Sequence, residues 1–232
     1  DNGSRNGTFV NGVRVSGTEP LRAGDTIAVG NVDLMFDGRQ VLRRVTERDY
    51  RGITVHNAAF AVDGHQLLAD VSVTARPGTL TAVIGPSGAG KSTLIKLISG
   101  QYTPTAGAVS FDGHNLHAEF AALRSRIGVV PQDDVVHRQL TVEQALRYAA
   151  ELRLPPDTTR ADREALIDRV LAELGLTEHR RKRVDQLSGG QRKRASVAME
   201  LLTGPSVLIL DEPTSGLDPA LDRQGMTMLR QL

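Results

Sequence analysis

A run of glycines that ends in lysine and serine is the first place where chemistry can be read from residue types in this chain of 232 residues. The run spans Gly85 to Ser92 and has the spacing GxxxxGK[ST]. Glycines at this spacing let backbone N–H groups turn inward around a phosphate, the lysine reaches the terminal phosphates, and the serine hydroxyl can bind Mg²⁺. The run therefore predicts binding of a nucleoside triphosphate, with Lys91 on the phosphates and Ser92 on the metal.

Two adjacent carboxylates follow the apolar run Val207–Leu210. A buried strand ending there would present Asp211 to Mg²⁺, and Glu212 beside it could polarise an attacking water as a general base. The alternative is a pair of solvated acids at a strand end. The phosphate loop argues against that alternative, because a triphosphate site needs a metal ligand and a base.

A second pair of glycines lies in Leu187–Gln191, ahead of a basic triplet. Ser188 and Gln191 have the spacing of a capping box, so one interpretation is simply a well-capped helix. The other interpretation is that Gly189 and Gly190 leave a helix N-terminus bare, as the close approach of a phosphate requires. The residues alone leave both interpretations open.

The elements that must position these residues form an α/β pattern. Capping and stop residues mark the helix ends, with Thr141 and Gln144 as a second capping box and Gly175 as a stop. The expected elements are a strand at Leu80–Ile84, helices at Ser92–Ser99, from Thr141 to near Pro155, and around Arg163–Leu174, and a buried strand at Val207–Leu210.

Residues 1–38 differ from the rest of the chain, because three Asn-Gly pairs separate short strand-like pieces. We expect antiparallel strands at Thr8–Val10, Val13–Val15, Thr26–Val29 and Val32–Phe36. A segment of this length cannot bury a core of its own. We therefore expect it to be the tail of a larger β domain. The charged residues 39–52 are expected to be a solvated linker.

Composition excludes several classes of protein. Hydrophobic residues make up 40% and charged residues 24% of the chain, which is typical of a globular domain. There is no cysteine, so disulfide chemistry is excluded and a cytosolic setting fits. The net charge of +1 gives no reason to expect nucleic acid as a partner. No apolar stretch reaches the roughly 20 residues that span a bilayer.

Taken in order, the phosphate loop, Leu187–Gln191 and Val207–Asp218 resemble the nucleotide-binding domain of ABC ATPases over residues 53–232. The resemblance implies an α/β P-loop NTPase fold with a mixed sheet core and a helical subdomain at about residues 133–190. It also implies ATP and Mg²⁺, and a head-to-tail homodimer that holds ATP between the phosphate loop of one copy and Ser188–Gln191 of the other. Gln132 matches the Q-loop, which senses Mg²⁺ and couples to a transmembrane partner, and Ser215–Asp218 matches the D-loop.

The site residues that this resemblance implies fall into three groups. The catalytic residues are Glu212, Gln132 and Lys91. The nucleotide-binding residues are Gly85, Pro86, Ser87, Gly88, Ala89, Gly90, Lys91, Ser92, Thr93, Ser188, Gly189, Gly190, Gln191 and Asp218. The metal ligands are Ser92, Gln132 and Asp211.

The segments Pro131–His137, Leu140–Glu143, Leu152–Pro155 and Ala198–Leu202 are similar to ABC-2 type exporters of the G subfamily. In these exporters the ATPase precedes its membrane domain in one polypeptide. The similarity implies a C-terminal transmembrane domain outside this chain, a place at the cytoplasmic face of the plasma membrane, and a hydrophobic or lipid-like substrate.

Residues Gly3–Gly12 and Leu21–Gly30 resemble the C-terminal half of a forkhead-associated (FHA) domain, an all-β sandwich that binds phosphothreonine peptides. Asn6 and Arg5 match the loop that holds the peptide backbone, whereas the phosphate-binding arginine and serine of that family lie upstream of residue 1. The two resemblances together are similar to actinobacterial, including mycobacterial, ABC exporters with fused FHA domains.

Two departures from the family pattern and one basic run carry expectations of their own. The aromatic residue that stacks on adenine is expected near Val62, with Phe60 as its substitute or as plain core. The switch histidine is expected about 30 residues after Glu212, beyond Leu232, so weak or absent hydrolysis is expected of this fragment. The basic run Arg180–Arg183 is expected to be a solvated face, with attraction of nucleotide or acidic lipid as the alternative.

Two functions other than transport stay open from the sequence. One is a soluble ABC ATPase that acts on DNA ends or ribosomes. The interval from Gln132 to Leu187 has room for a compact helical subdomain but not for the long coiled coil of the DNA-end proteins. The other is a phosphopeptide-binding module alone, against which the complete set of ATPase motifs argues.

Overall fold

A computed structural model of the protein describes residues 4, 6–44, 52–132 and 135–213. The chain divides into two compact units, Asp1–Ile127 and Gly128–Leu232, and each is described by itself. None of the helices in the described residues combines the length and the hydropathy needed to cross a bilayer.

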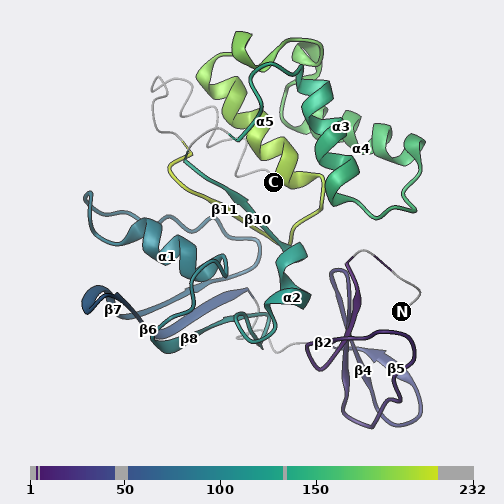
Figure 1. Ribbon diagram of the computed structural model, residues 1–232, viewed down its shortest axis with the longest axis vertical. Coiled ribbons are helices and arrows are strands. Elements are labelled where there is room, and N and C mark those ends of the chain that lie inside the picture. The colour runs from purple at the N-terminus through teal and green to yellow at the C-terminus, as the bar shows by residue number, and fades with distance from the viewer. Residues whose placement is uncertain (1–3, 5, 45–51, 133–134, 214–232) are drawn as a thin grey trace. The chain divides into compact units, whose positions relative to one another are not determined.

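The N-terminal sheet of the first unit has five antiparallel strands in the order β2-β1-β3-β4-β5 (Figure 1). Asn11 and Gly12 form the turn between β1 and β2 with φ of 51° and 79°, as the Asn-Gly pairs predict. Phe9 and Ile27 are its buried apolar side chains. The strands are β1 (Thr8–Val10), β2 (Val13–Arg14), β3 (Thr26–Val29), β4 (Val32–Phe36) and β5 (Val41–Arg43).

The expected linker is shorter than its charge pattern indicates. Residues 41–43 lie in β5, which pairs with β4 through Leu34 and Arg43. All three residues of β5 are exposed, so neither burial nor alternation marks this strand in the sequence.

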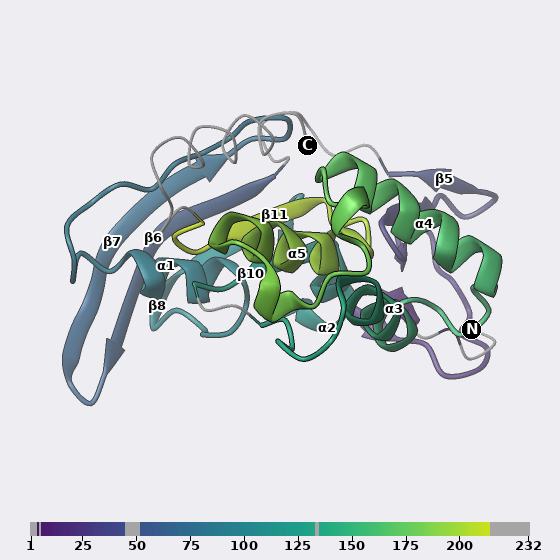
Figure 2. The same ribbon diagram turned by 90° about the horizontal axis from the view of Figure 1, so that it is seen from above.

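The second sheet of the first unit has four antiparallel strands in the order β7-β6-β8-β9. They are β6 (Ile53–Val62), β7 (His65–Ala75), β8 (Ala106–Phe111) and β9 (His114–Asn115). Figure 2 shows β6 and β7 as long curved strands beside helix α1 (Lys91–Ile98). The chain then passes through α2 (Phe120–Leu123) and the 3₁₀ turn η2 (Arg124–Arg126).

The expected strand at Leu80–Ile84 is not formed. Residues 80–84 carry no strand assignment, and none of the described residues pairs with them. The side chains of Leu80 and Ile84 are 52% and 92% exposed. The apolar run is real, but a strand also needs a hydrogen-bonded neighbour.

In its described residues, the second unit combines helices α3, α4 and α5 with the two-stranded sheet β10-β11 (Figure 1). Its core contains buried apolar side chains from all three helices, including Leu146, Ile167, Leu171 and Val197. The main elements are β10 (Ile127–Val130), α3 (Val142–Arg153), α4 (Arg160–Glu173), the 3₁₀ turns η3 (Thr177–His179) and η4 (Val184–Gln186), α5 (Gly189–Leu201) and β11 (Val207–Leu210).

The predicted ends of these helices are confirmed. Thr141 caps α3 with Gln144 in a complete capping box, and the chain leaves α4 through Gly175 with φ of 60°. In β11, Ile209 is buried and the other three residues are half-buried. The expectation that all of β11 is buried is therefore met only in part.

Candidate functional site

The phosphate loop leads directly into helix α1. Gly90 is the N-cap of α1 and has φ of 87°, and no described side chain caps the first turn. The backbone N–H groups of this turn are therefore left for a ligand, at the positive end of the helix dipole. A Cβ at Gly90 would lie 2.6 Å from Cδ2 of Leu68, so glycine is required for space as well as for conformation.

Lys91 lies folded over the same loop. Its Nζ donates to the carbonyl oxygens of Gly85 and Pro86 at 2.8 and 2.9 Å. The ammonium thus stays at the loop, while the hydroxyl of Ser92 is exposed on the first turn. A bare helix N-terminus, a lysine at the loop and a free hydroxyl suit the phosphates and Mg²⁺ of a nucleotide, so the residues present fit these groups.

In the second unit, the amide of Gln132 lies on the carboxylate of Glu212. Nε2 of Gln132 donates to Oε2 of Glu212 at 3.0 Å, across 80 residues of sequence. The N–H of Asp211 donates to the carbonyl of Val130 at 2.9 Å, so the pairing of β10 with β11 extends to Asp211, the predicted metal ligand. The sequence pattern selected both Gln132 and Glu212, and the structure brings them together.

Glu212 has an unusual backbone. Its φ is 44°, in the left-handed region that non-glycine residues seldom adopt. Its side chain is exposed. A strained backbone that presents an exposed carboxylate at a strand end is typical of a residue kept for chemistry.

The segment Leu187–Gln191 begins helix α5. Ser188 is the N-cap, its side chain accepts from the N–H of Gln191, and the side chain of Gln191 accepts in return from the N–H of Ser188. Gly189 and Gly190 fill the first two helical positions without side chains. The two interpretations of this segment are compatible, because the cap leaves the two glycines open to an approaching ligand.

Sequence reasoning missed Lys193, which lies on α5 and is 9% exposed. Its Nζ donates to the carbonyl oxygens of Pro131 and Gln132 at 2.7 and 3.1 Å. A buried ammonium needs such partners. Lys193 therefore ties the helix that begins at the signature segment to the Q-loop that carries Gln132. The basic triplet was its only signal in the sequence.

The basic run 180–183 is committed in part to carboxylates of its own unit. Arg180 pairs with Glu143, Glu164 and Asp168, and its hydrogen bond to Glu143 lowers the pKa of that carboxyl. Arg183 pairs with Asp185. These ion pairs join α3, α4 and the segment after η3, so the run serves the fold of the helical subdomain.

Phe60 does not fit the role of adenine platform. It is 8% exposed, and its ring stacks on that of Tyr102 with centroids 5.0 Å apart. Val62, at the end of β6, is 44% exposed. Of the two candidates, Val62 is the one that a ligand can reach. Arg5 and Ser215–Asp218 lie outside the described residues, and Asn6 is exposed.

A sequence profile of the ABC transporter family matches residues 68–215, which is more than half of the chain. The chain belongs to the ABC transporter family. It also carries an FHA segment, since the profile of that domain matches residues 1–30. Both resemblances that the motifs predict are thereby confirmed.

Two curated relatives and a solved structure agree with this assignment. ABC transporter ATP-binding/permease protein Rv1747 of Mycobacterium tuberculosis is 64% identical, over 100% of this chain and 27% of the relative. ABC transporter G family member 26 of Arabidopsis thaliana is 44% identical, over 67% of this chain and 23% of the relative. The structure of cbiO1 from Clostridium perfringens, part of the cbiONQ complex, superposes with a TM-score of 0.71 at 30% identity, over 77% of this chain and 72% of cbiO1.

The chain therefore spans about a quarter of the length of these two curated relatives. It is an ATP-binding domain of the ABC transporter family with an α/β P-loop NTPase fold, preceded by FHA sequence.

Proposed function

We propose that this chain is the ATP-hydrolysing domain of an exporter for hydrophobic or lipid-like substrates, regulated by phosphothreonine through its FHA part. The hydrogen bond between Gln132 and Glu212 carries the proposal. The G-family and ATP-binding/permease relatives support export and a membrane domain that follows the ATPase.

The residues divide the chemistry among them. Backbone N–H groups before α1 and the ammonium of Lys91 hold the phosphates of ATP. Glu212 takes a proton from the attacking water, and the amide of Gln132 fixes the orientation of its carboxylate. Ser92, Gln132 and Asp211 would hold Mg²⁺, which when bound would supply charge neutralisation on the phosphates. The bare start of α5 in a second copy, at Ser188–Gln191, closes the site.

The test is assembly of the Glu212→Gln variant. Loss of the base should stop hydrolysis but keep ATP bound, so sedimentation with ATP and Mg²⁺ should show a stable dimer that disappears without nucleotide. Glu173→Gln, an exposed glutamate at the end of α4, is the matched control and should not trap a dimer. A Glu212→Gln protein that binds ATP and stays monomeric would refute the sandwich arrangement.

A further inference from the structure

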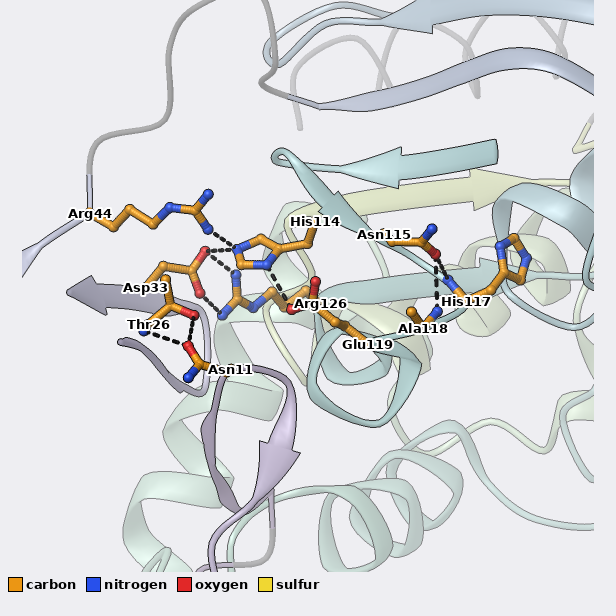
Figure 3. A network of polar contacts seen from close by, with 10 residues as sticks. All are labelled: Asn11, Thr26, Asp33, Arg44, His114, Asn115, His117, Ala118, Glu119 and Arg126. Atoms are coloured by element: carbon orange, nitrogen blue, oxygen red, sulfur yellow. Dashed lines mark hydrogen bonds and ion pairs between the residues drawn. The ribbon is translucent and has the colours of Figure 1, made fainter. Parts of the chain in front are cut away.

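A buried arginine joins the N-terminal sheet, defined here as β1–β5, to the ATPase part of the first unit. Arg126, the last residue of η2, is 2% exposed. Its Nη1 and Nη2 donate to the two carboxylate oxygens of Asp33 at 2.9 and 2.6 Å (Figure 3). Its Nε donates to the carbonyl of Gly30 at 2.9 Å. All three guanidinium nitrogens are thus bound by the N-terminal sheet.

His114 extends the same contact from β9. Its Nδ1 lies 2.8 Å from Oε2 of Glu119, and its Nε2 lies 2.7 Å from Nη1 of Arg44 and 3.3 Å from Oδ2 of Asp33. The neutral ring accepts from Arg44 at Nε2, whereas the protonated ring donates to Asp33. Asp33 therefore lies between the guanidinium of Arg126 and the ring of His114, as Figure 3 shows.

Electrostatics and packing both support a firm contact. Burial alone would raise the pKa of Asp33, but hydrogen bonds from His114 and Arg126 outweigh it and hold that pKa well below its usual range. At the turn between β1 and β2, a Cβ on Gly12 would lie 2.8 Å from Cγ of Glu119, so the backbone of the turn packs closely on this side chain.

The burial of Arg126 shows that this contact is not an incidental surface pair. An exposed ion pair contributes little, but a buried arginine that loses its carboxylate leaves an uncompensated charge. Moving the N-terminal sheet away would remove these three hydrogen bonds of Arg126 at once. The docked arrangement is therefore strongly favoured.

Arg126 is connected to the Q-loop through strand β10. Arg126 directly precedes β10, and Gln132 follows β10 after Pro131. We propose that the N-terminal sheet is a docked regulatory element whose Asp33–Arg126 clamp holds the start of β10 and so controls the Q-loop. This inference rests on the proposed function, which supplies phosphothreonine binding as the input and hydrolysis at Glu212 as the output.

The test is hydrogen exchange of β10 amides in the 232-residue chain, with Asp33→Asn and Arg126→Met. Each variant should accelerate exchange at Ile127–Val130 at least fivefold and leave α4 unchanged. The double variant should exchange no faster than either single variant, because each single substitution already removes the whole clamp. The double variant also lacks both the carboxylate of Asp33 and the guanidinium of Arg126, so neither is left without its partner. Asp37→Asn is the matched control: its carboxylate, in the loop between β4 and β5, accepts from the N–H groups of Arg39 and Gln40.

Exchange in Asp33→Asn equal to that in Asp37→Asn, or additive effects in the double variant, would overturn the clamp. Binding of a phosphothreonine peptide to the full-length protein is measured separately by calorimetry. Failure of the wild type to bind such peptides would refute the proposed phosphothreonine input, while the exchange result would still decide the clamp. If peptide binds and the clamp holds, the peptide should change the ATPase rate of the wild type and leave that of Asp33→Asn unchanged.

Discussion

Replacement of Lys193 by methionine should lower ATP turnover without a comparable loss of ATP binding. Methionine retains the apolar stem within α5 but removes the donors to the carbonyls of Pro131 and Gln132. The Q-loop then loses its hydrogen bonds to α5, and the hydrogen bond from the amide of Gln132 to Glu212 is formed a smaller fraction of the time. We assign the hold on the nucleotide to the phosphate loop and Lys91, so ATP binding should be affected less than turnover.

The magnitude follows from the two hydrogen bonds. A hydrogen bond to a charged group contributes about 1.5–3 kcal/mol. Gln132 is exposed, so water can replace part of the loss, and we take about 1.5–3 kcal/mol for the pair together. That range corresponds to roughly a 10- to 150-fold fall in the ratio of ordered to disordered Q-loop. We expect kcat to fall within that range and KM for ATP to change less than about threefold.

The assay is steady-state ATP hydrolysis by the full-length protein, with kcat and KM determined separately. Arg194→Met is the matched control, since Arg194 lies on the same helix and donates to the carbonyl of Leu174 instead of the Q-loop. Lys193→Arg should restore part of the rate. A Lys193→Met enzyme whose kcat lies within twofold of that of Arg194→Met would refute the reasoning.

Two further predictions concern stability. The pKa of His114 is raised by its hydrogen bond to Asp33, so the contribution of His114 to the free energy of unfolding is complete below pH 6.5 and is lost as the pH rises through the folded pKa. The pKa of Asp33 is lowered, so the contribution of Asp33 is complete above pH 3.8 and is lost in acid. Urea unfolding should therefore show His114→Gln losing the alkaline part of this dependence, and an unchanged difference from wild type across pH 5–8 would contradict it. Gly90→Ala should lower the free energy of unfolding by about 1–2 kcal/mol more than Gly88→Ala. Both glycines have positive φ, but only at Gly90 would a Cβ meet a neighbour, the side chain of Leu68. Equal midpoints of the two variants in thermal unfolding would contradict this prediction.

Local signals in the sequence predicted local structure well. The Asn-Gly turn at residues 11–12, the caps at Thr141 and Ser188 and the stop at Gly175 all depend on neighbours within a few residues, and all are present. The candidate site residues Lys91, Gln132 and Glu212 could be proposed from the sequence because their motifs have fixed spacing.

What the sequence did not reveal depends on distant partners. Arg126 and Asp33 lie 93 residues apart, and Lys193 donates to a carbonyl 62 residues away. No local sequence pattern predicts either contact. The stack of Phe60 on Tyr102 is hidden for the same reason. Leu80–Ile84 failed as a strand because strand formation depends on a neighbour, which an apolar run does not specify.

The left-handed backbone of Glu212 has a consequence for protein engineering. A non-glycine residue in that region costs about 1–2 kcal/mol, so glycine at position 212 would relax the chain and stabilise the second unit. A screen that selects variants by melting temperature alone would favour this change and would discard the carboxylate that we propose as the general base. The proposed base is thus a residue that selection for stability works against, and thermostable variants of this domain should be screened for turnover at the same time.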